Sequence, residues 1–407
     1  MAVNLPGLDR LLPVPGVRLG TACAGIKHLD RDDLALLVLD PGTTVSAVFT
    51  QSGFRAAPVE VAESRIREGQ PRVLLINSGN ANAATGEPGV ADARELCDHA
   101  ARRLGDGLGG EQVLPFSTGV IGERLPVDAI RRGIDSTATA LSGDGWAAAA
   151  TAIMTTDTGP KAVSKRIRIE DAEVCITGMA KGSGMLKPDM ATLLAFICCD
   201  AGICKVALDK LTREVASNSF NRVTIDGDTS TNDAFVIAAT GVADHRVIEQ
   251  AGESYDALRS GLETVACELA QRIVRDGEGA TKFVTVRVTG GSTETECLAV
   301  AYTIAESPLV KTAIFAGDPN WGRFCMAIGR AGIADLDSGK VSLSLDDVVV
   351  ARGGLVAEDY VEAAAAEVMA RDEYAVNVDL GRGDSKAVVW TSDLSYEYVR
   401  INAEYRT

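Results

Sequence analysis

The stretch that decides the fold is Thr192-Leu-Leu-Ala-Phe-Ile-Cys-Cys199. A short apolar run with a β-branched start is typical of a strand that is buried on both faces. The run follows a polar loop, Lys181-Gly-Ser-Gly-Met-Leu-Lys-Pro-Asp189, and the small residue Ala191. Thr192 is therefore either an ordinary first residue of a strand or a hydroxyl group placed where it can do chemistry.

Outward from this stretch, apolar β-branched runs alternate irregularly with amphipathic helical segments, without strict βαβ repetition. This order favours a layered α+β fold over a doubly wound parallel sheet. The predicted strands are 34–39, 45–50, 73–77, 173–177, 192–199, 222–226, 234–239 and 283–288, and the predicted helices are 90–104, 144–154, 208–217, 255–275, 295–305 and 359–370. Gly290-Gly291 is the best composition break, so we expect a large domain over 1–290 and a smaller α/β domain over 291–407.

Composition excludes several classes of protein. The formal net charge of -16 and the lack of a basic run argue against a nucleic-acid partner. No apolar run approaches the roughly 20 residues that a membrane span requires. The nine cysteines contain no CxxC pair, and we interpret them as free thiols of a cytoplasmic protein. With only three histidines, few candidates exist for a histidine base or metal site, and we expect no metal.

Several polar loops resemble binding motifs without matching them. The glycines of Gly182-Ser-Gly184 fail the pattern GxGxxG, because position 187 is Lys. The loop Asp226-Gly-Asp-Thr-Ser-Thr-Asn-Asp233 has Thr231 where a calcium loop needs Gly, and no Glu follows at its twelfth position. Such loops, rich in Gly, Asn and Thr, instead indicate a polar cavity lined by backbone N–H groups and hydroxyls.

A hydroxyl nucleophile without a histidine needs another base. One source is the α-amino group of the nucleophile itself, which is released when the preceding peptide bond is cut. Its reference pKa of about 7.7–8.0 leaves a useful neutral fraction near pH 7. The hydroxyl of Thr192 can attack the carbonyl of Ala191 and leave an ester for water, and the β-branch restricts its rotamers.

The motif KGSGMLKPDMATLLAF (181–196) resembles the cleavage and nucleophile motif of the ornithine acetyltransferase family of arginine biosynthesis. Further motifs resemble the family in the same order along nearly the whole chain: SGNANAATGEPG (78–89), STGVIGERLP (117–126), IMTTDT (153–158), SFNRVTIDGDTSTND (219–233), IVRDGEGATKFV (273–284), SPLVKTAIFAGDPNWGR (307–323) and YVRINAEYRT (398–407). The resemblance implies an αββα sandwich of the type found in self-processing aminopeptidases, with a smaller C-terminal α/β domain whose tail returns to the active site.

The resemblance also implies self-cleavage between Ala191 and Thr192, which gives an α chain, 1–191, and a β chain, 192–407, assembled as an α2β2 heterotetramer. Thr192 would carry acetyl from N2-acetylornithine to glutamate in a ping-pong reaction without a cofactor. The family pattern assigns an oxyanion hole to Thr118 and Gly119. It assigns substrate contacts to Thr155, Lys181, Thr192, Glu278, Asn402 and Thr407.

The sequence leaves three alternatives open. Acetyl-CoA is a second acetyl donor if the protein is bifunctional, and neither composition nor spacing decides that. An aminopeptidase or amidase of the same fold would resolve the acyl-enzyme with water instead of an amine. A non-catalytic amino-acid-binding protein would keep an intact chain.

Overall fold

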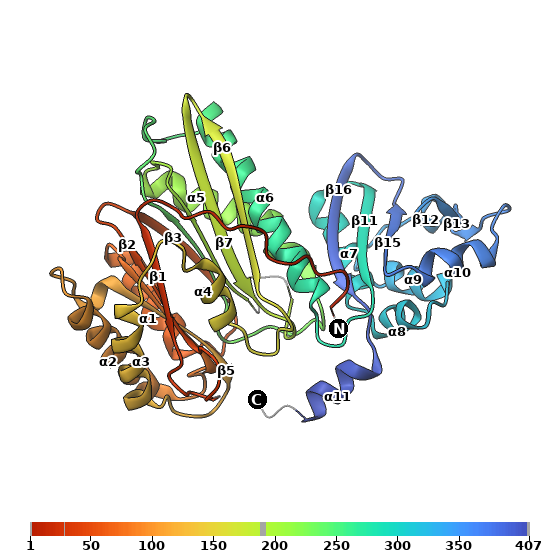
Figure 1. Cartoon of the computed structure of the whole chain (residues 1–407). Coiled ribbons are helices and arrows are strands. Elements are labelled where there is room, and N and C mark those ends of the chain that lie inside the picture. The colour runs from red at the N-terminus through yellow and green to blue at the C-terminus, as the bar shows by residue number, and fades with distance from the viewer. Residues whose placement is uncertain (1, 28, 188–192, 405–407) are drawn as a thin grey trace. The chain divides into compact units, whose positions relative to one another are not determined.

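The computed structural model describes residues 2–27, 29–187 and 193–404 (Figure 1). The chain forms two compact units. Among the described residues, the large unit contains Pro6–Asn221 and Asp228–Ile273, and the small unit contains residues 2–5, Arg222–Gly227 and 274–404.

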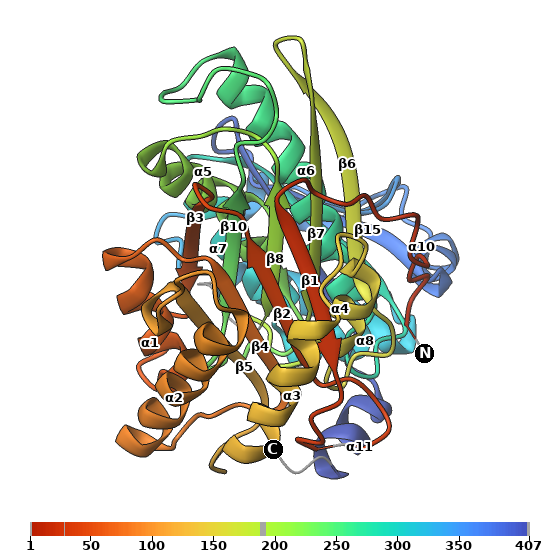
Figure 2. The same ribbon diagram turned by 60° about the vertical axis from the view of Figure 1, so that its left-hand side comes forward.

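Two sheets form the centre of the large unit (Figure 2). The four-stranded sheet has the order β1-β2-β4-β5, with β1 (Val17–Ala22), β2 (Leu34–Leu39), β4 (Val73–Asn80) and β5 (Val113–Val120). The five-stranded sheet has the order β3-β10-β8-β7-β6, with β3 (Thr44–Phe49), β10 (Ala234–Ala239), β8 (Leu194–Cys199), β7 (Ala172–Lys181) and β6 (Lys161–Ile169). The pairs β4–β5 and β8–β10 are parallel, and the other pairs of neighbours are antiparallel.

The core between these sheets explains why their strands are apolar on both faces. Alternate residues of β8, Leu194, Phe196 and Cys198, pack in this core with side chains of both sheets. Phe116 of β5 and Phe196 of β8 meet edge to face, with ring centroids 5.1 Å apart. Because successive strand residues point to opposite faces, Ile197 faces away from this core. A side chain at Gly178 would contact both Ile197 and Leu269, which lies in the helix Glu253–Arg275.

Helices cover the outer faces of the two sheets and complete the αββα layers (Figure 1). Leu34 and Leu36 form a second core with Leu96 and Ile130, which lie on two of these helices. The helices of the large unit are α1 (Ala57–Glu68), α2 (Gly86–Leu104), α3 (Val127–Thr139), α4 (Trp146–Ala152) and α5 (Lys205–Asn218), with α6 (Glu253–Arg275) continuing into the small unit. The expected α+β class with an αββα sandwich is confirmed by these layers.

The small unit is a seven-stranded sheet with helices packed on its apolar face. Its order is β14-β13-β12-β15-β11-β16-β9, with β14 (Leu355–Val356), β13 (Val348–Arg352), β12 (Ser342–Leu345), β15 (Glu373–Asp379), β11 (Phe283–Gly291), β16 (Ser385–Ser392) and β9 (Val223–Thr224). Its helices are α7 (Glu294–Ala305), α8 (Pro308–Ala316), α9 (Trp321–Gly329), α10 (Glu362–Ala370) and α11 (Tyr396–Glu404). Val286 and Val288 of β11 share a core with Ile304 of α7 and Phe324 of α9.

This division differs from the expected boundary at residue 290. Strand β11 lies inside the sheet of the small unit, so that unit takes up the chain again at Val274. Gly290 has a φ of +71°, and a Cβ there would lie 2.0 Å from Oδ1 of Asp379. The lack of a side chain at Gly290 therefore allows β11 to lie close to Asp379 of β15, and the Gly290-Gly291 pair does not mark a linker.

None of the helices in the described part of the chain has, taken singly, the length and apolar composition of a membrane span. Helices α7 and α8 meet that requirement only when taken together, across a bend of 59°.

Candidate active site

Thr118 and Gly119 lie near the end of β5, where this strand approaches β4 closely. The strand runs through Val120, in a region where the sequence predicted no strand. Gly119 has a φ of +132°, and a Cβ there would lie 2.3 Å from the backbone carbon of Gly79. Any side chain at residue 119 would displace β4, so the close packing of β4 and β5 requires glycine at this position.

Buried amide side chains fix this end of β5. Asn232 donates through Nδ2 to the carbonyl of Ala81 at 2.6 Å and to that of Ser117 at 2.9 Å. The hydroxyl of Ser117 donates in turn to Oδ1 of Asn77 at 2.6 Å. Asn232 thus ties the loop 226–233 to the residue that precedes Thr118. Sequence reasoning assigned Asn232 no role, and its only signal was its place in a polar loop beside a strand.

Lys181 is the last residue of β7, and its ammonium group reaches β5. Its Nζ donates to Oγ1 of Thr118 at 3.2 Å, and the residue is 8% exposed. In the antiparallel register of β7 and β8, Lys181 lies opposite Leu194, two positions after Thr192 in the chain. The structure therefore brings together Lys181 and Thr118, which lie far apart in the sequence.

Asp157 links the backbone of Gly182, the residue after Lys181, to that of Thr155. Its Oδ1 accepts from Nζ of Lys161 at 2.6 Å and from the N–H of Gly182 at 2.8 Å, and its Oδ2 accepts from the N–H of Thr155 at 3.0 Å. The Asp157 and Lys161 side chains are both 0% exposed.

Burial by itself would raise the pKa of Asp157. The charges of Lys161 and Lys181, together with its hydrogen bonds, nevertheless hold this pKa well below its usual range. Asp157 is thus an ionised carboxylate at the centre of the cluster. Asp157 belongs to the motif IMTTDT (153–158), but sequence reasoning assigned it no role.

Asp233 lies at the start of β10, on the other side of β8 from β7. The N–H of Ala234 donates to the carbonyl of Leu193 at 3.0 Å, so this aspartate lies beside the residue that follows Thr192. Burial raises the pKa of Asp233 well above its usual range. The charge of Lys181 and the hydrogen bonds with the Leu193 backbone and with Ser230 lower this pKa, but burial has the larger effect. Within the described part of the chain, its Oδ2 has no hydrogen-bond partner. Sequence reasoning also missed this buried acid.

Glu278 and Asn402 meet in the small unit. Asn402 of α11 donates through Nδ2 to Oε2 of Glu278 at 2.9 Å and to the carbonyl of Tyr398 at 3.0 Å. A Cβ at Gly279, which has a φ of +67°, would lie 2.4 Å from the backbone nitrogen of Tyr398. The turn that carries Glu278 is therefore packed directly against the first turn of α11.

Three of the predicted site residues, Ala191, Thr192 and Thr407, lie outside the described residues. The strand predicted over 192–199 is confirmed from Leu194 to Cys199. Of the remaining predicted residues, Thr118, Gly119, Thr155 and Lys181 belong to the large unit, whereas Glu278 and Asn402 belong to the small unit.

The αββα layers, with a buried polar cluster where β5, β7, β8 and β10 approach one another, define the class of the protein: an α+β enzyme with its candidate site at strand ends of two facing sheets. Comparison with known proteins identifies the family. The model of the ArgJ family matches residues 18–407.

Two curated relatives are each named arginine biosynthesis bifunctional protein ArgJ. The protein from Pseudomonas syringae pv. tomato is 50% identical over 408 aligned residues, which cover 100% of both chains. The protein from Methylococcus capsulatus is 51% identical over 98% of this chain and 97% of its own. A crystal structure of the arginine biosynthesis bifunctional protein from Bacillus halodurans is 36% identical, with a TM-score of 0.49, and covers 51% of this chain and 96% of that one.

The chain therefore belongs to the ArgJ family, an acyltransferase family of arginine biosynthesis. This confirms the family and the enzyme class that the ordered motifs predicted.

Proposed function

We propose that this enzyme moves an acetyl group from N2-acetylornithine to glutamate through an ester on Thr192. The observation that carries the proposal is the 50% identity to an arginine biosynthesis bifunctional protein along the full chain. The cluster of Thr118, Lys181 and Asp233 supports it: Lys181 bonds to Thr118 and lies opposite Leu194, and Asp233 bonds to the backbone of Leu193, the residue after Thr192.

The precursor first cuts itself. The hydroxyl of Thr192 attacks the carbonyl carbon of Ala191, the bond from that carbon to the nitrogen of Thr192 breaks, and the nitrogen takes up a proton. Water then hydrolyses the resulting ester. The products are an α chain ending at Ala191 and a β chain beginning at Thr192, whose free α-amine serves as the base.

Acetyl transfer uses the same hydroxyl twice. Thr192 attacks the acetyl carbonyl of N2-acetylornithine, its proton passes to the departing ornithine amine, and an acetyl ester remains. The neutral amine of glutamate attacks this ester and releases the hydroxyl. Donors at Thr118 and Gly119 stabilise the oxyanion in both steps, and the loss of one such donor typically costs about 2.7–4 kcal/mol of transition-state stabilisation.

The remaining predicted residues bind the amino-acid parts of the substrates. Lys181 supplies positive charge for a carboxylate, and Glu278 supplies negative charge for an ammonium group. Thr155, Asn402 and the terminal Thr407 contribute polar contacts. Acetyl-CoA serves as a second donor in this proposal, which is supported by the fact that both relatives are named bifunctional proteins. A cytoplasmic location and an α2β2 assembly complete the proposal.

Initial rates with different donors test this function. Glutamate is supplied with acetylornithine or acetyl-CoA, and hydrolysis of peptides and amides is measured in parallel. We expect acetyl transfer from acetylornithine to exceed hydrolysis by a wide margin. Dominant peptide hydrolysis would instead identify an aminopeptidase.

Intact mass spectrometry tests the cleavage. We expect two fragments that separate before Thr192, and for Thr192→Ala a single inactive chain of 42.6 kDa. Normal processing of Thr192→Ala would refute the shared nucleophile. A wild-type protein that stays intact and inactive would favour a binding protein.

A further inference from the structure

A basic pocket lies at the edge of the five-stranded sheet, beside strand β3 and between α1 and α5. Its volume is about 670 Å³. Four cationic and two anionic side chains line it: Arg55, Arg67, Lys205, Arg213, Glu63 and Asp209. A local excess of positive charge is unusual in a chain whose net charge is -16, and it indicates an anionic ligand.

The ion pairs inside this basic pocket do not neutralise all of its positive charge. Glu63 is shared by Arg55 at 2.7 Å and Arg67 at 2.6 Å, so one carboxylate faces two guanidinium groups. Lys205 pairs with Asp209. Arg213 is exposed and has no ion pair among the described residues. Guanidinium groups in such a position bind phosphate oxygens well, because their planar N–H donors match phosphate geometry.

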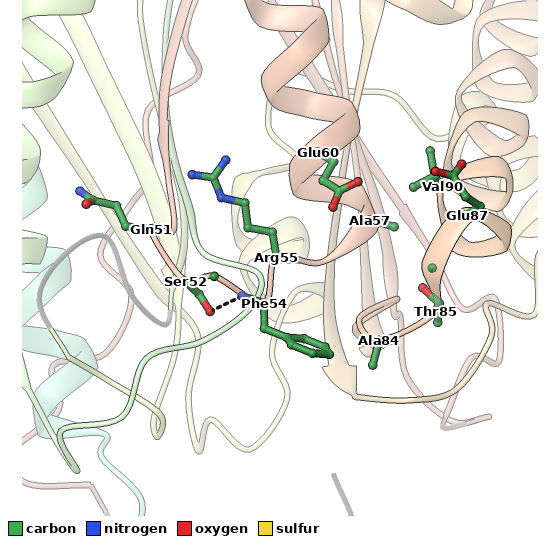
Figure 3. A pocket seen from close by; sticks show the side chains of 12 residues that line it. Gln51, Ser52, Phe54, Arg55, Ala57, Glu60, Ala84, Thr85, Glu87 and Val90 are labelled. Atoms are coloured by element: carbon green, nitrogen blue, oxygen red, sulfur yellow. Dashed lines mark hydrogen bonds between the residues drawn. The ribbon is translucent and has the colours of Figure 1, made fainter.

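A second pocket of about 690 Å³ adjoins the first and shares Gln51 and Arg55 with it (Figure 3). Phe54 lines this pocket and is 64% exposed, with its backbone N–H bonded to the hydroxyl of Ser52 at 3.2 Å. The pocket also holds Glu60 and Glu87, which disfavour phosphate there. It therefore suits a neutral aromatic group that stacks on Phe54.

Both pockets are connected by hydrogen bonds to the candidate active site in the same unit. The N–H of Thr50 donates to the carbonyl of Asp233 at 3.0 Å, and its hydroxyl donates to the carbonyl of Ser230 at 2.8 Å. The loop 51–55 then returns to the same segment, because the N–H of Ala56 donates to the carbonyl of Thr231 at 2.9 Å. The loop 51–55, which lines both pockets, is thus bonded at its two ends to the segment 230–233. Asn232 of that segment bonds to Ser117, the residue before Thr118 on β5.

We propose that the two pockets bind the phosphorylated adenosine end of acetyl-CoA, with phosphates at Arg67 and Arg213 and the adenine on Phe54. The inference rests on the proposed function, because acetyl-CoA must deliver its acetyl group to Thr192. In that step the bond from the acetyl carbon to sulfur breaks and the bond to Oγ of Thr192 forms, while the hydroxyl proton leaves with the CoA thiol. Acetylornithine has neither phosphate nor adenine and makes no use of these pockets.

The test compares two acetyl donors on the same processed enzyme. In Arg67→Ala/Arg213→Ala and in Phe54→Ala we expect KM for acetyl-CoA to rise at least tenfold. KM for acetylornithine is the internal reference and should stay within twofold of wild type. Lys210→Ala is the matched control, because Lys210 lies on α5 outside the pocket and pairs with Glu214. S-Acetylpantetheine, which lacks the phosphates and the adenine, should react equally well with all variants.

Isothermal titration with 3′-phosphoadenosine 5′-phosphate provides a readout that does not require turnover. We expect binding to the wild type and to Lys210→Ala, and at least tenfold weaker binding to the two pocket variants. An unchanged KM for acetyl-CoA in the pocket variants would overturn the proposal, and so would an equal rise in KM for both donors. If the enzyme uses acetylornithine but not acetyl-CoA, only the second donor of the proposed function is wrong, and titration with CoA then tests the pocket by itself. CoA binding to the wild type that is lost in the pocket variants would support the site. Absence of CoA binding to the wild type would overturn it.

Discussion

Replacement of Asp157 by Asn tests how the buried cluster holds the candidate site. The substitution keeps the shape of the side chain but removes the negative charge that faces Lys161, and both side chains are 0% exposed. Removing one partner of a buried ion pair typically costs 3–5 kcal/mol, because the other charge stays buried without its counter-ion. We therefore expect the free energy of unfolding of the large unit to fall by about 3–5 kcal/mol at pH 7.

The pH dependence of this loss has a definite sign. The pKa of Asp157 is held low in the folded protein, so its contribution is fully present above its unfolded pKa of about 3.9. The contribution disappears as the pH falls through the folded pKa. Wild type and Asp157→Asn should thus differ most above about pH 5 and converge in strong acid.

Urea unfolding followed by tryptophan fluorescence measures this difference. Trp146 is 1% exposed, and it belongs to the large unit. With Trp321→Phe and Trp390→Phe as background it is the sole tryptophan, because the chain contains only three. The signal therefore reports the unit that contains Asp157.

The double variant Asp157→Asn/Lys161→Met provides the control. Without the buried ammonium group the main penalty is gone, so we expect its stability to recover to within about 2 kcal/mol of wild type. The reasoning is refuted if Asp157→Asn loses less than about 1 kcal/mol, or if the double variant loses the sum of the two single losses.

Three further predictions concern other parts of the chain. Burial lowers the pKa of Lys311 to about 8, so between pH 8 and 10.5 the unfolded chain binds more protons and wild type gains roughly 3 kcal/mol of stability as the pH rises. Lys311→Met should abolish this gain in denaturant midpoints measured across the same range, and a parallel gain in the variant would contradict the assignment. Asn402→Ala removes the side chain that donates a hydrogen bond to Glu278 at 2.9 Å. We expect KM for the amino-acid substrates to rise several-fold with little change in kcat. An effect on kcat alone would exclude a role of Asn402 in substrate binding. Gly119→Ala forces a Cβ to within 2.3 Å of the backbone of Gly79 and should destabilise the large unit by about 2–5 kcal/mol, measured by urea unfolding; full stability would show that β4 and β5 separate easily.

The structure confirms several elements that a strong local pattern predicted. Runs such as 34–39 and 234–239 are strands with the predicted bounds, because a continuous apolar stretch must be buried on both faces. Other elements were missed, among them the helix α3 (Val127–Thr139) and the whole of β5 (Val113–Val120), whose Ser-Thr-Gly end has no apolar periodicity. Its strand geometry depends on pairing with β4, which no local pattern contains.

The sequence alone determined the family, the layered α+β class, and which residues to consider for chemistry, because ordered motifs and apolar periodicity are local properties of the chain. Only the tertiary structure decided that Lys181 reaches Thr118, that Asn232 holds the end of β5, and that Asp157 is a buried anion. It also moved the expected boundary at 290, because β11 pairs with β15 and β16 far along the chain. Except for the pair of Asp157 and Lys161, which are four positions apart, these features arise from contacts between residues far apart in the chain. Burial then sets the charge state of each group.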